Sequence, residues 1–334
     1  MAAVAASQEP SFEALLAGEL DTDQLRAVAD HIAARHAASP KGDGAAFRKT
    51  LALAAASDAQ RAELARHQDA IARRIAAGRV RAVAGEPTDL LHDFAGPVLE
   101  VMRSGMAGEA NTLANRYLDI APQGAAGWSL LPLYLSLRAS ADGDAELADS
   151  LLAPARPRLV VIGGLSGTGK STLARLLGSR IGRLPGARVL RSDVFRKRLA
   201  GVSPETRLPP RHYTRHNDDE TYEALFESAD DHLACGNSVI LDAVFMSRGE
   251  RDVAEALADR YRAAFTGIWL EAPERDRIAR VAARAHDASD ATEAVVREQS
   301  RRSVGEIHWH RIRVNRPQEL IVAAARAALD RTRR

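Results

Sequence analysis

The chain is poor in cysteine and has no long apolar run. Its lone cysteine, Cys235, excludes a disulfide framework and a zinc site built from several cysteines. No stretch approaches the roughly 18 consecutive apolar residues that a membrane-spanning helix needs. The N-terminus lacks the basic start and apolar core of a signal peptide. We therefore expect a soluble, cytoplasmic protein that has no membrane partner.

Aromatic residues and lysines are also scarce. Aromatics make up 4% of the chain and apolar residues 46%, so the cores must consist mostly of Ala, Leu, Val and Ile. The 46 basic and 44 acidic residues nearly cancel, which argues against nucleic acid as a partner. Because arginine supplies nearly all the positive charge, a lysine at position 170 or 197 indicates a specific role more strongly than an arginine would.

Residues 1–150 are predicted to form an all-helical domain. Apolar residues recur three and four positions apart, without the alternation that is typical of strands. Glycine and proline place breaks at residues 42–44 and 84–87. The expected helices cover residues 23–38, 45–56, 58–77, 90–103, 109–119 and 128–139.

Beyond this region the pattern changes. Residues 151–157 are predicted to be a linker because Pro154 and Pro157 bracket small residues. Residues 158–334 then alternate short apolar runs with helical patterns, which indicates a parallel sheet with helices between its strands. The expected strands cover residues 159–163, 187–191, 238–241 and 265–270.

A glycine-rich loop follows the first of these strands. Residues 164–171 match the pattern G-x-x-x-x-G-K-[ST], with a strand before it and a helix after it. Such a loop points backbone N–H groups at phosphate oxygens, Lys170 reaches the β- and γ-phosphates, and Ser171 takes a place on Mg²⁺. The alternative is a strand–helix turn without a ligand, but the residue types and the setting favour ATP. The expected nucleotide-binding residues are Gly164, Leu165, Ser166, Gly167, Thr168, Gly169, Lys170, Ser171 and Thr172.

The loop defines the predicted fold class as a P-loop NTPase-type parallel sheet flanked by helices and preceded by an all-helical domain. Two acidic residues are expected to face the loop from the carboxyl ends of neighbouring strands. Asp193 is a candidate catalytic base that orients a substrate hydroxyl, although it would also suit a helix N-cap. Asp242 is a candidate ligand of Mg²⁺ or of a substrate hydroxyl, with a simple turn as the alternative.

An arginine-rich helix is predicted to begin after Pro273. Arg277, Arg280 and Arg284 share one face of it, where they could neutralise a transferring phosphoryl group as part of a lid. A solvated face is the alternative. Residues 201–216 are expected to cap the substrate. Several histidines lack a metal-ligand spacing, so no structural metal is expected; they are His212, His216, His308 and His310.

Four segments together resemble a family. They are 163–172, 191–197, 241–245 and 288–291, and their order resembles bacterial proteins in which an aminoglycoside-phosphotransferase-like domain is fused to a C-terminal P-loop kinase or ATPase domain of the AAA family. The latter domain is similar to gluconate kinase, adenylylsulfate kinase and the zeta toxins, over residues 156–334. The resemblance implies that Lys170, Ser171 and Thr172 bind nucleotide and magnesium. It also implies that Asp193 and Arg196 face the substrate and that Arg280 and Arg284 belong to the lid.

The N-terminal half resembles the same fused family in part. Residues 77–86, 92–102 and 115–134 are similar to helices around the phosphotransferase catalytic loop. The family's H-G-D-x-x-x-x-N loop, its metal-binding Asp and its nucleotide-binding lobe are missing from this sequence. The resemblance therefore implies a truncated remnant, without aminoglycoside transfer, that serves to bind a protein partner.

Two functions fit these residues. The first is an ATP-dependent phosphotransferase that moves the γ-phosphate of Mg·ATP to a hydroxyl of a small metabolite. In a zeta-toxin-like variant of this function, the acceptor is a nucleotide sugar. The second is a nucleotide-dependent switch with slow turnover. A nucleic-acid end kinase lacks the expected basic stripe interleaved with aromatics. Asp193 favours the phosphotransferase, because a switch needs no base for a substrate hydroxyl.

Overall fold

The computed structural model describes residues 21–283 and 288–332, and its N-terminal part is helical as expected. Aspartate or serine side chains cap several of these helices, which satisfies backbone N–H groups at the first turn. The helices are α2 (Thr22–Ala38), α3 (Gly44–Ala54), α4 (Asp58–Arg66), α5 (Gln68–Ala76), α6 (Leu90–Arg103), α7 (Ala107–Ile120), α8 (Gly124–Ala141) and α9 (Ala145–Leu152).

The helical region departs from the prediction in three places. The helix expected over 58–77 is divided at His67. Helix α9 was not expected, and it includes the first two residues of the segment predicted to be a linker. A hairpin of β1 (Val80–Val83) and β2 (Glu86–Asp89) interrupts the helices, so the all-helical prediction is wrong there. The break expected at this point is the hairpin turn, in which Ala84 and the following glycine both have positive φ.

A five-stranded parallel sheet forms the C-terminal part, which confirms the predicted α/β class. The strand order is β4-β5-β3-β6-β7. Four strands lie within two residues of their expected positions, whereas β7 was missed because charged residues flank its single buried position. The strands are β3 (Arg158–Gly163), β4 (Arg188–Arg191), β5 (Val239–Asp242), β6 (Ala264–Glu271) and β7 (His310–Arg313).

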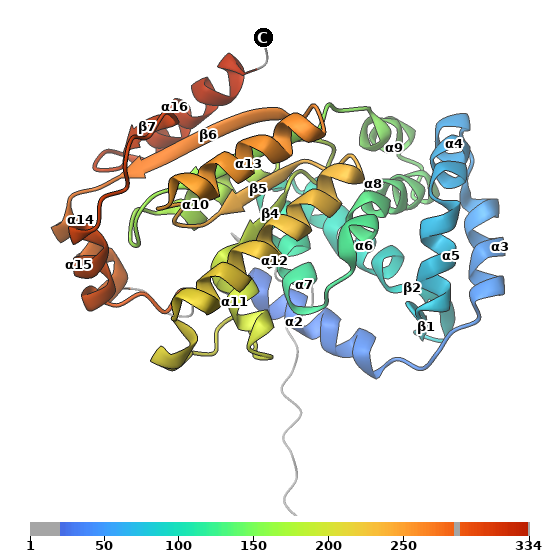
Figure 1. Cartoon of the computed structure of the whole chain (residues 1–334). Helices are drawn as coiled ribbons and strands as arrows, with labels where there is room; N and C mark the ends of the chain where they lie inside the picture. The colour runs from blue at the N-terminus through green and yellow to red at the C-terminus, as the bar shows by residue number, and fades with distance from the viewer. Residues whose placement is uncertain (1–20, 284–287, 333–334) are drawn as a thin grey trace, which may run out of the picture.

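Helices cover both faces of this sheet (Figure 1). Helices α12 (Arg215–Ala234) and α13 (Arg248–Arg260) pack on one face, and α10 (Lys170–Gly178) and α16 (Gln318–Arg331) pack on the other. Successive side chains of β3 alternate between the two apolar cores, as the period of a strand requires. The sheet is therefore buried on both faces. None of the described helices is long and apolar enough to cross a membrane.

The helical region docks against β4, the edge strand of the sheet. Asn115 of α7 accepts hydrogen bonds from the Val189 backbone N–H and from Arg188, both at 2.7 Å. Asn111 donates to the carbonyl of Ala187 at 3.0 Å. These side chains pair with backbone groups that an edge strand would otherwise leave open. Arg188 itself is buried and also donates to Asp119 at 2.5 Å.

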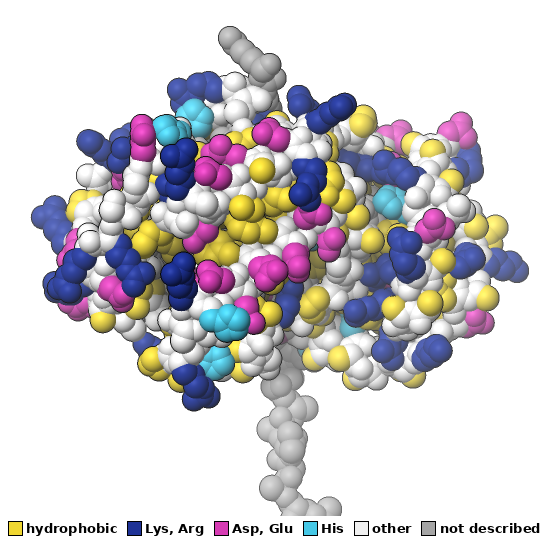
Figure 2. Space-filling model, in the orientation of Figure 1, with side chains coloured by type: hydrophobic (Ala, Val, Ile, Leu, Met, Phe, Trp, Pro, Cys, Tyr) yellow, Lys and Arg dark blue, Asp and Glu magenta, His cyan; other side chains and the backbone are white. Residues whose placement is uncertain are grey.

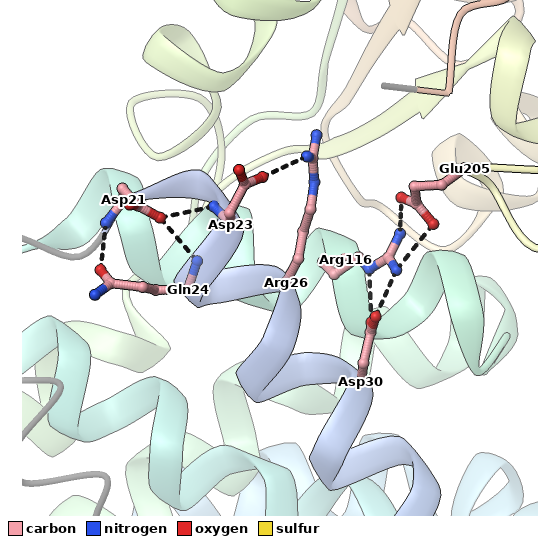
Figure 3. A network of polar contacts seen from close by, with 7 residues as sticks. All are labelled: Asp21, Asp23, Gln24, Arg26, Asp30, Arg116 and Glu205. Carbon is pink, nitrogen blue, oxygen red and sulfur yellow. Dashed lines mark hydrogen bonds and ion pairs between the residues drawn. The ribbon is translucent and has the colours of Figure 1, made fainter. Parts of the chain in front are cut away.

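A second polar contact joins the helical region to the loop between α11 and α12. Arg116 of α7 donates to both carboxylate oxygens of Asp30 at 2.8 Å and to Glu205 at 2.5 Å (Figure 3). Figure 3 shows its guanidinium between the two acids, which belong to α2 and to the expected substrate-capping loop. One arginine therefore connects the N-terminal helices to a loop of the C-terminal part.

Candidate active site

The phosphate-binding loop joins β3 to α10 and needs glycine for steric reasons. A Cβ atom on Gly164 would lie 2.6 Å from the carbonyl oxygen of Leu270, and one on Gly167 would lie 2.6 Å from that of Arg277. Both glycines also have positive φ, which side-chain-bearing residues rarely adopt. The loop thus passes close to β6 and to α14 (Glu274–Ala282) at the base of the site.

Lys170 lies in the first turn of α10 and folds over the loop. Its ammonium donates to the carbonyl oxygens of Gly164 at 2.7 Å and Leu165 at 3.3 Å. Thr168 donates to the same Leu165 carbonyl at 2.8 Å. The predicted nucleotide-binding residues, 164–172, therefore form one loop and the following helix N-terminus, where backbone N–H groups and the helix dipole favour an anion.

Arg191 connects two of the predicted site residues. Its guanidinium donates to the Ser171 hydroxyl at 3.1 Å and to the Asp242 carboxylate at 3.3 Å. Asp242 is buried at the end of β5, and Arg191 ends the neighbouring strand β4. Arg191 was not predicted to be a site residue. The signal that could have found it is a cation at the carboxyl end of a strand beside the phosphate loop.

Ser171 and Asp242 fit a magnesium ion chemically. A hydroxyl and a carboxylate are hard oxygen donors, and Mg²⁺ usually keeps several waters while it binds one or two protein groups and substrate phosphates. The described residues contain no group of three or more acidic, histidine or cysteine side chains placed to hold a metal. The two oxygen donors therefore fit an ion whose remaining ligands are water and phosphate oxygens.

Asp193 lies in the first turn of α11 (Ser192–Leu199), next to the carboxyl end of β4. The N-cap position of this helix is Arg191, and no side chain caps it. The N-cap alternative for Asp193 is therefore wrong. Burial and a hydrogen bond to Asp290 raise the pKa of Tyr213, and the charge of Asp193 raises it further. Asp193 thus lies close enough to Tyr213 for the charge of its carboxylate to act on the Tyr213 hydroxyl.

Arg196 follows one turn later and contacts the predicted substrate-capping loop. It donates to Asp218 at 2.7 Å and to the carbonyl of His212 at 3.1 Å. Its guanidinium carbon lies 5.0 Å from the centre of the Tyr213 ring, in a cation–π arrangement. The predicted substrate-binding residues Asp193 and Arg196 therefore share α11 and border the same loop.

The arginine-rich helix α14 packs against the phosphate loop and is not a solvated face. Arg280 donates to the carbonyls of Val314 at 2.8 Å and Gly167 at 3.5 Å. Arg277 is 4% exposed, and its Nε and Nη1 atoms have no hydrogen-bond partner within residues 21–283 and 288–332. The predicted lid residue Arg284 lies outside the described residues.

Helix α15 (Glu293–Arg301) also reaches the loop. The side-chain oxygen of Gln299 accepts a hydrogen bond from the Ser166 backbone N–H at 2.8 Å. Ser300, the next residue, accepts from Arg277 at 2.5 Å. Both helices that follow β6 therefore contact the phosphate loop or the arginine beside it.

A cavity of about 260 Å³ opens beside the phosphate loop, between α10, α16 and the end of β7. Aliphatic side chains and two arginines line it, a mixture that is typical of small-molecule sites. The lining includes Thr168, Thr172, Leu176, Arg280, Arg316 and Ile321.

The parallel sheet and the loop at the end of β3 define the C-terminal part as a P-loop NTPase-type domain. A family model described as an AAA domain matches residues 159–304. Uncharacterized proteins of Mycobacterium tuberculosis and Mycobacterium bovis are 33% identical over 183 residues, which make up 54% of this chain and 36% of each relative. The match thus spans little more than a third of the length of these curated relatives.

Solved structures of two kinases are similar to the chain. A gluconokinase from Sinorhizobium meliloti 1021 is 20% identical, with a TM-score of 0.38 over 52% of this chain and 93% of that chain. An APS kinase from Mycobacterium tuberculosis, in complex with AMPPNP and APS, is 21% identical, with a TM-score of 0.36 over 53% of this chain and 99% of that chain.

Proposed function

We propose that the chain is an ATP-dependent phosphotransferase that moves the γ-phosphate of Mg·ATP to a hydroxyl group of a small metabolite. The observation that carries the proposal is the placement of Asp193 at the carboxyl end of β4, beside the strand that ends in Asp242. A carboxylate at this edge can orient an acceptor hydroxyl and take its proton. A nucleotide-dependent switch is the alternative, and it has no use for such a base.

The proposed nucleotide site combines the phosphate loop with the neighbouring cavity. Residues 164–172 would hold the phosphates, while the adenine base would enter the cavity of about 260 Å³ between α10 and α16. The backbone of Arg277 lies beside Gly167, and two of its guanidinium nitrogens have no hydrogen-bond partner among the described residues, so that they suit an anion. Arg280 would border the base and not the transferred group.

Magnesium would be held by Ser171 and Asp242, where it supplies charge neutralisation for the β- and γ-phosphates when bound. Arg191 contacts both residues, so it is placed to orient them. Lys170 would turn from the loop carbonyls to the phosphates, because an ammonium prefers an anionic partner.

A small metabolite suits the site better than nucleic acid. Acidic side chains form a row across the middle of the face shown in Figure 2, over α12. The neighbouring helix α11 carries three basic residues in its last turn, but Arg196 is paired with Asp218 and Lys197 with Asp290. A phosphate backbone would be repelled by the acidic row.

The helical region is proposed to be a truncated aminoglycoside-phosphotransferase-like remnant. Its contacts with β4 and with Glu205 support a role in holding the sheet edge from which Asp193 and Arg191 project. Surfaces of this region that face away from the sheet remain available for a protein partner.

The substitution Asp193→Asn tests the phosphotransferase. The amide preserves shape but accepts no proton, so transfer should fall by roughly 10²–10⁴ while nucleotide affinity stays within a few-fold. Transfer to water, measured as ATP hydrolysis, can be followed before the acceptor is known. Calorimetry with Mg·AMPPNP reports the affinity.

A matched control is Asp252→Asn on α13, whose exposed carboxylate pairs with Arg248 at 3.6 Å. This variant should hydrolyse ATP like the parent. Full activity of the Asp193→Asn variant would refute the general base and leave the switch as the better explanation.

A further inference from the structure

Asp290 connects the segment between α14 and α15 to α11 and to the loop that follows α11. Its carboxylate accepts hydrogen bonds from the Lys197 ammonium, from the Tyr213 hydroxyl and from the Leu208 backbone N–H, the last at 3.0 Å. These three donors come from α11 and from the loop between α11 and α12. Asp290 itself lies between α14 and α15, which contact the phosphate loop.

Lys197 is buried where it contacts Asp290. The side chain is only 1% exposed, and it lies on α11 one turn after Asp193. Its ammonium also donates to the carbonyl of Thr206 at 2.6 Å. A buried ammonium needs a nearby opposite charge, so the position of α11 depends on Asp290.

The carboxylate remains charged in this environment. Burial raises the pKa of Asp290, but the hydrogen bonds from Lys197 and Tyr213 outweigh it and lower the pKa below its ordinary value. Tyr213 in turn lies under the guanidinium of Arg196. The residues proposed to face the acceptor therefore share one network with Asp290.

The other side of the connection runs through the two helices that flank Asp290. Gln299 of α15 accepts from the Ser166 N–H, and Arg280 of α14 contacts the carbonyl of Gly167. A nucleotide bound at the phosphate loop would lie close to these groups. Because α15 begins three residues after Asp290, a shift of α15 would act on Asp290.

We propose that Asp290 is a positioning residue that couples nucleotide binding at the phosphate loop to the order of the acceptor loop, residues 201–213. The inference rests on the proposed function, because it assigns the acceptor to the side of Asp193. Nucleotide bound at the loop steadies α14 and α15, and Asp290 then holds α11 and the acceptor loop through Lys197, Tyr213 and Leu208.

Amide hydrogen exchange of the full chain, with and without Mg·AMPPNP, tests the coupling. In the parent, the nucleotide should slow exchange in residues 201–213 by about tenfold. In Asp290→Asn this slowing should fall to less than about twofold, although the nucleotide still protects residues 164–172. The control Glu293→Gln, an exposed carboxylate on α15 that pairs with Arg297, should behave like the parent.

Asp290→Asn leaves the buried Lys197 without its counter-charge, so the variant could unfold for that reason alone. A second variant, Asp290→Asn with Lys197→Met, removes both charges and should fold like the parent. Its acceptor loop should still fail to respond to Mg·AMPPNP. Restored stability with lost coupling separates positioning from simple structural support.

ATP hydrolysis supplies a second readout. In the double variant kcat should fall by roughly tenfold or more, while the Kd for Mg·AMPPNP stays within about threefold. Nucleotide-dependent protection of residues 201–213 in either Asp290 variant at the parental level would overturn the inference, as would a parental loop that ignores nucleotide. A parent that binds no nucleotide would instead refute the proposed function, and the inference with it.

Discussion

The two parts of the molecule are built around different cores. The described helical region has one apolar core, to which α2, α6, α7 and α8 contribute. The rings of Phe94 and Tyr117 stack within it, and their centroids lie 4.1 Å apart. The C-terminal part has two cores, one on each face of the sheet. A sheet with two covered faces still has edges, and β4 is one of them.

The contact that we describe between the two parts is polar. Asn111, Asn115 and Arg188 form a buried network at the β4 edge, and Arg116 pairs with acids from both parts. Such groups stabilise little in themselves, but they cost much when one partner is removed. The proposed chemistry lies in the C-terminal part, and the helical region holds the β4 edge beside it through these polar contacts.

The largest effect should come from Lys170→Ala, because the proposed chemistry takes place at the phosphate loop of the C-terminal part. Loss of the ammonium at the phosphate loop should reduce ATP turnover by roughly 10²-fold or more and weaken nucleotide binding. Stability should change little. The rate of ATP hydrolysis and calorimetry with Mg·AMPPNP check this expectation.

Lys49→Ala, an exposed lysine of α3 in the helical region, is the matched control for this experiment. It should leave turnover unchanged. A Lys170→Ala variant that hydrolyses ATP as fast as the parent would show that the site lies elsewhere.

The next effect should come from Asn115→Ala at the contact between the two parts. It removes the acceptor for the Val189 N–H and for the buried Arg188. We expect a loss of about 2–4 kcal/mol in the free energy of unfolding, because two buried donors lose a partner. Urea unfolding followed by tryptophan fluorescence and circular dichroism measures it.

Thr112→Ala on the same helix is the control, since its hydroxyl bonds only to the Gly108 carbonyl of its own helix at 2.9 Å among the contacts that we describe. It should cost less than about 1 kcal/mol. If Asn115→Ala costs no more than this control, the polar contact does not support the sheet edge.

A smaller effect should appear as pH falls. Burial and the charge of Arg138 lower the pKa of His92 to about 4, and burial and the charge of Arg188 lower that of His232 to about 3. Both histidines stay neutral in the folded protein below the unfolded pKa of 6.5. The stability that each neutral histidine provides is present above pH 6.5. It is lost as the pH falls below this value, by at most about 1.4 kcal/mol of unfolding free energy per pH unit for each histidine.

His92 lies in the helical region and His232 in the C-terminal part, so substitution of these two residues tests whether the two parts unfold together. His92→Gln and His232→Gln should each make the free energy of unfolding less dependent on pH between 6.5 and 5. If a single transition is observed, both substitutions should act on it. Two transitions, each responding to one substitution only, would show that the polar contact does not join the parts into one cooperative unit.

Much of the fold could be predicted because its signals are local. The fully apolar run of β3 and the periodic apolar positions of α6 specify their own structure. The missed elements have weak local signals. In β7 only Ile312 is buried, so neither the alternation nor the apolar run of a strand is visible in the sequence. In the hairpin at 80–89 the turn includes Ala84, which seldom adopts positive φ.

The candidate site was predictable for the same reason where one segment carries it. The phosphate loop lies between adjacent elements, so spacing alone brings its residues together. Arg191 gained a role only through its contacts with Ser171 and Asp242, which come from two other segments. Arg277 and Arg280 both lie on α14 and contact the region of Gly167, a packing that the spacing of the arginines alone could not show.

By itself, then, the sequence determined a parallel sheet, a phosphate loop at the end of its first strand and a helical region before it, because each depends on residues close together in the chain. Only the tertiary structure decided that Asn115 covers the β4 edge, that Arg116 reaches the acceptor loop and that Asp290 meets Lys197. These pairs are separated by 74, 89 and 93 residues, and side chains so far apart meet only after the cores have formed.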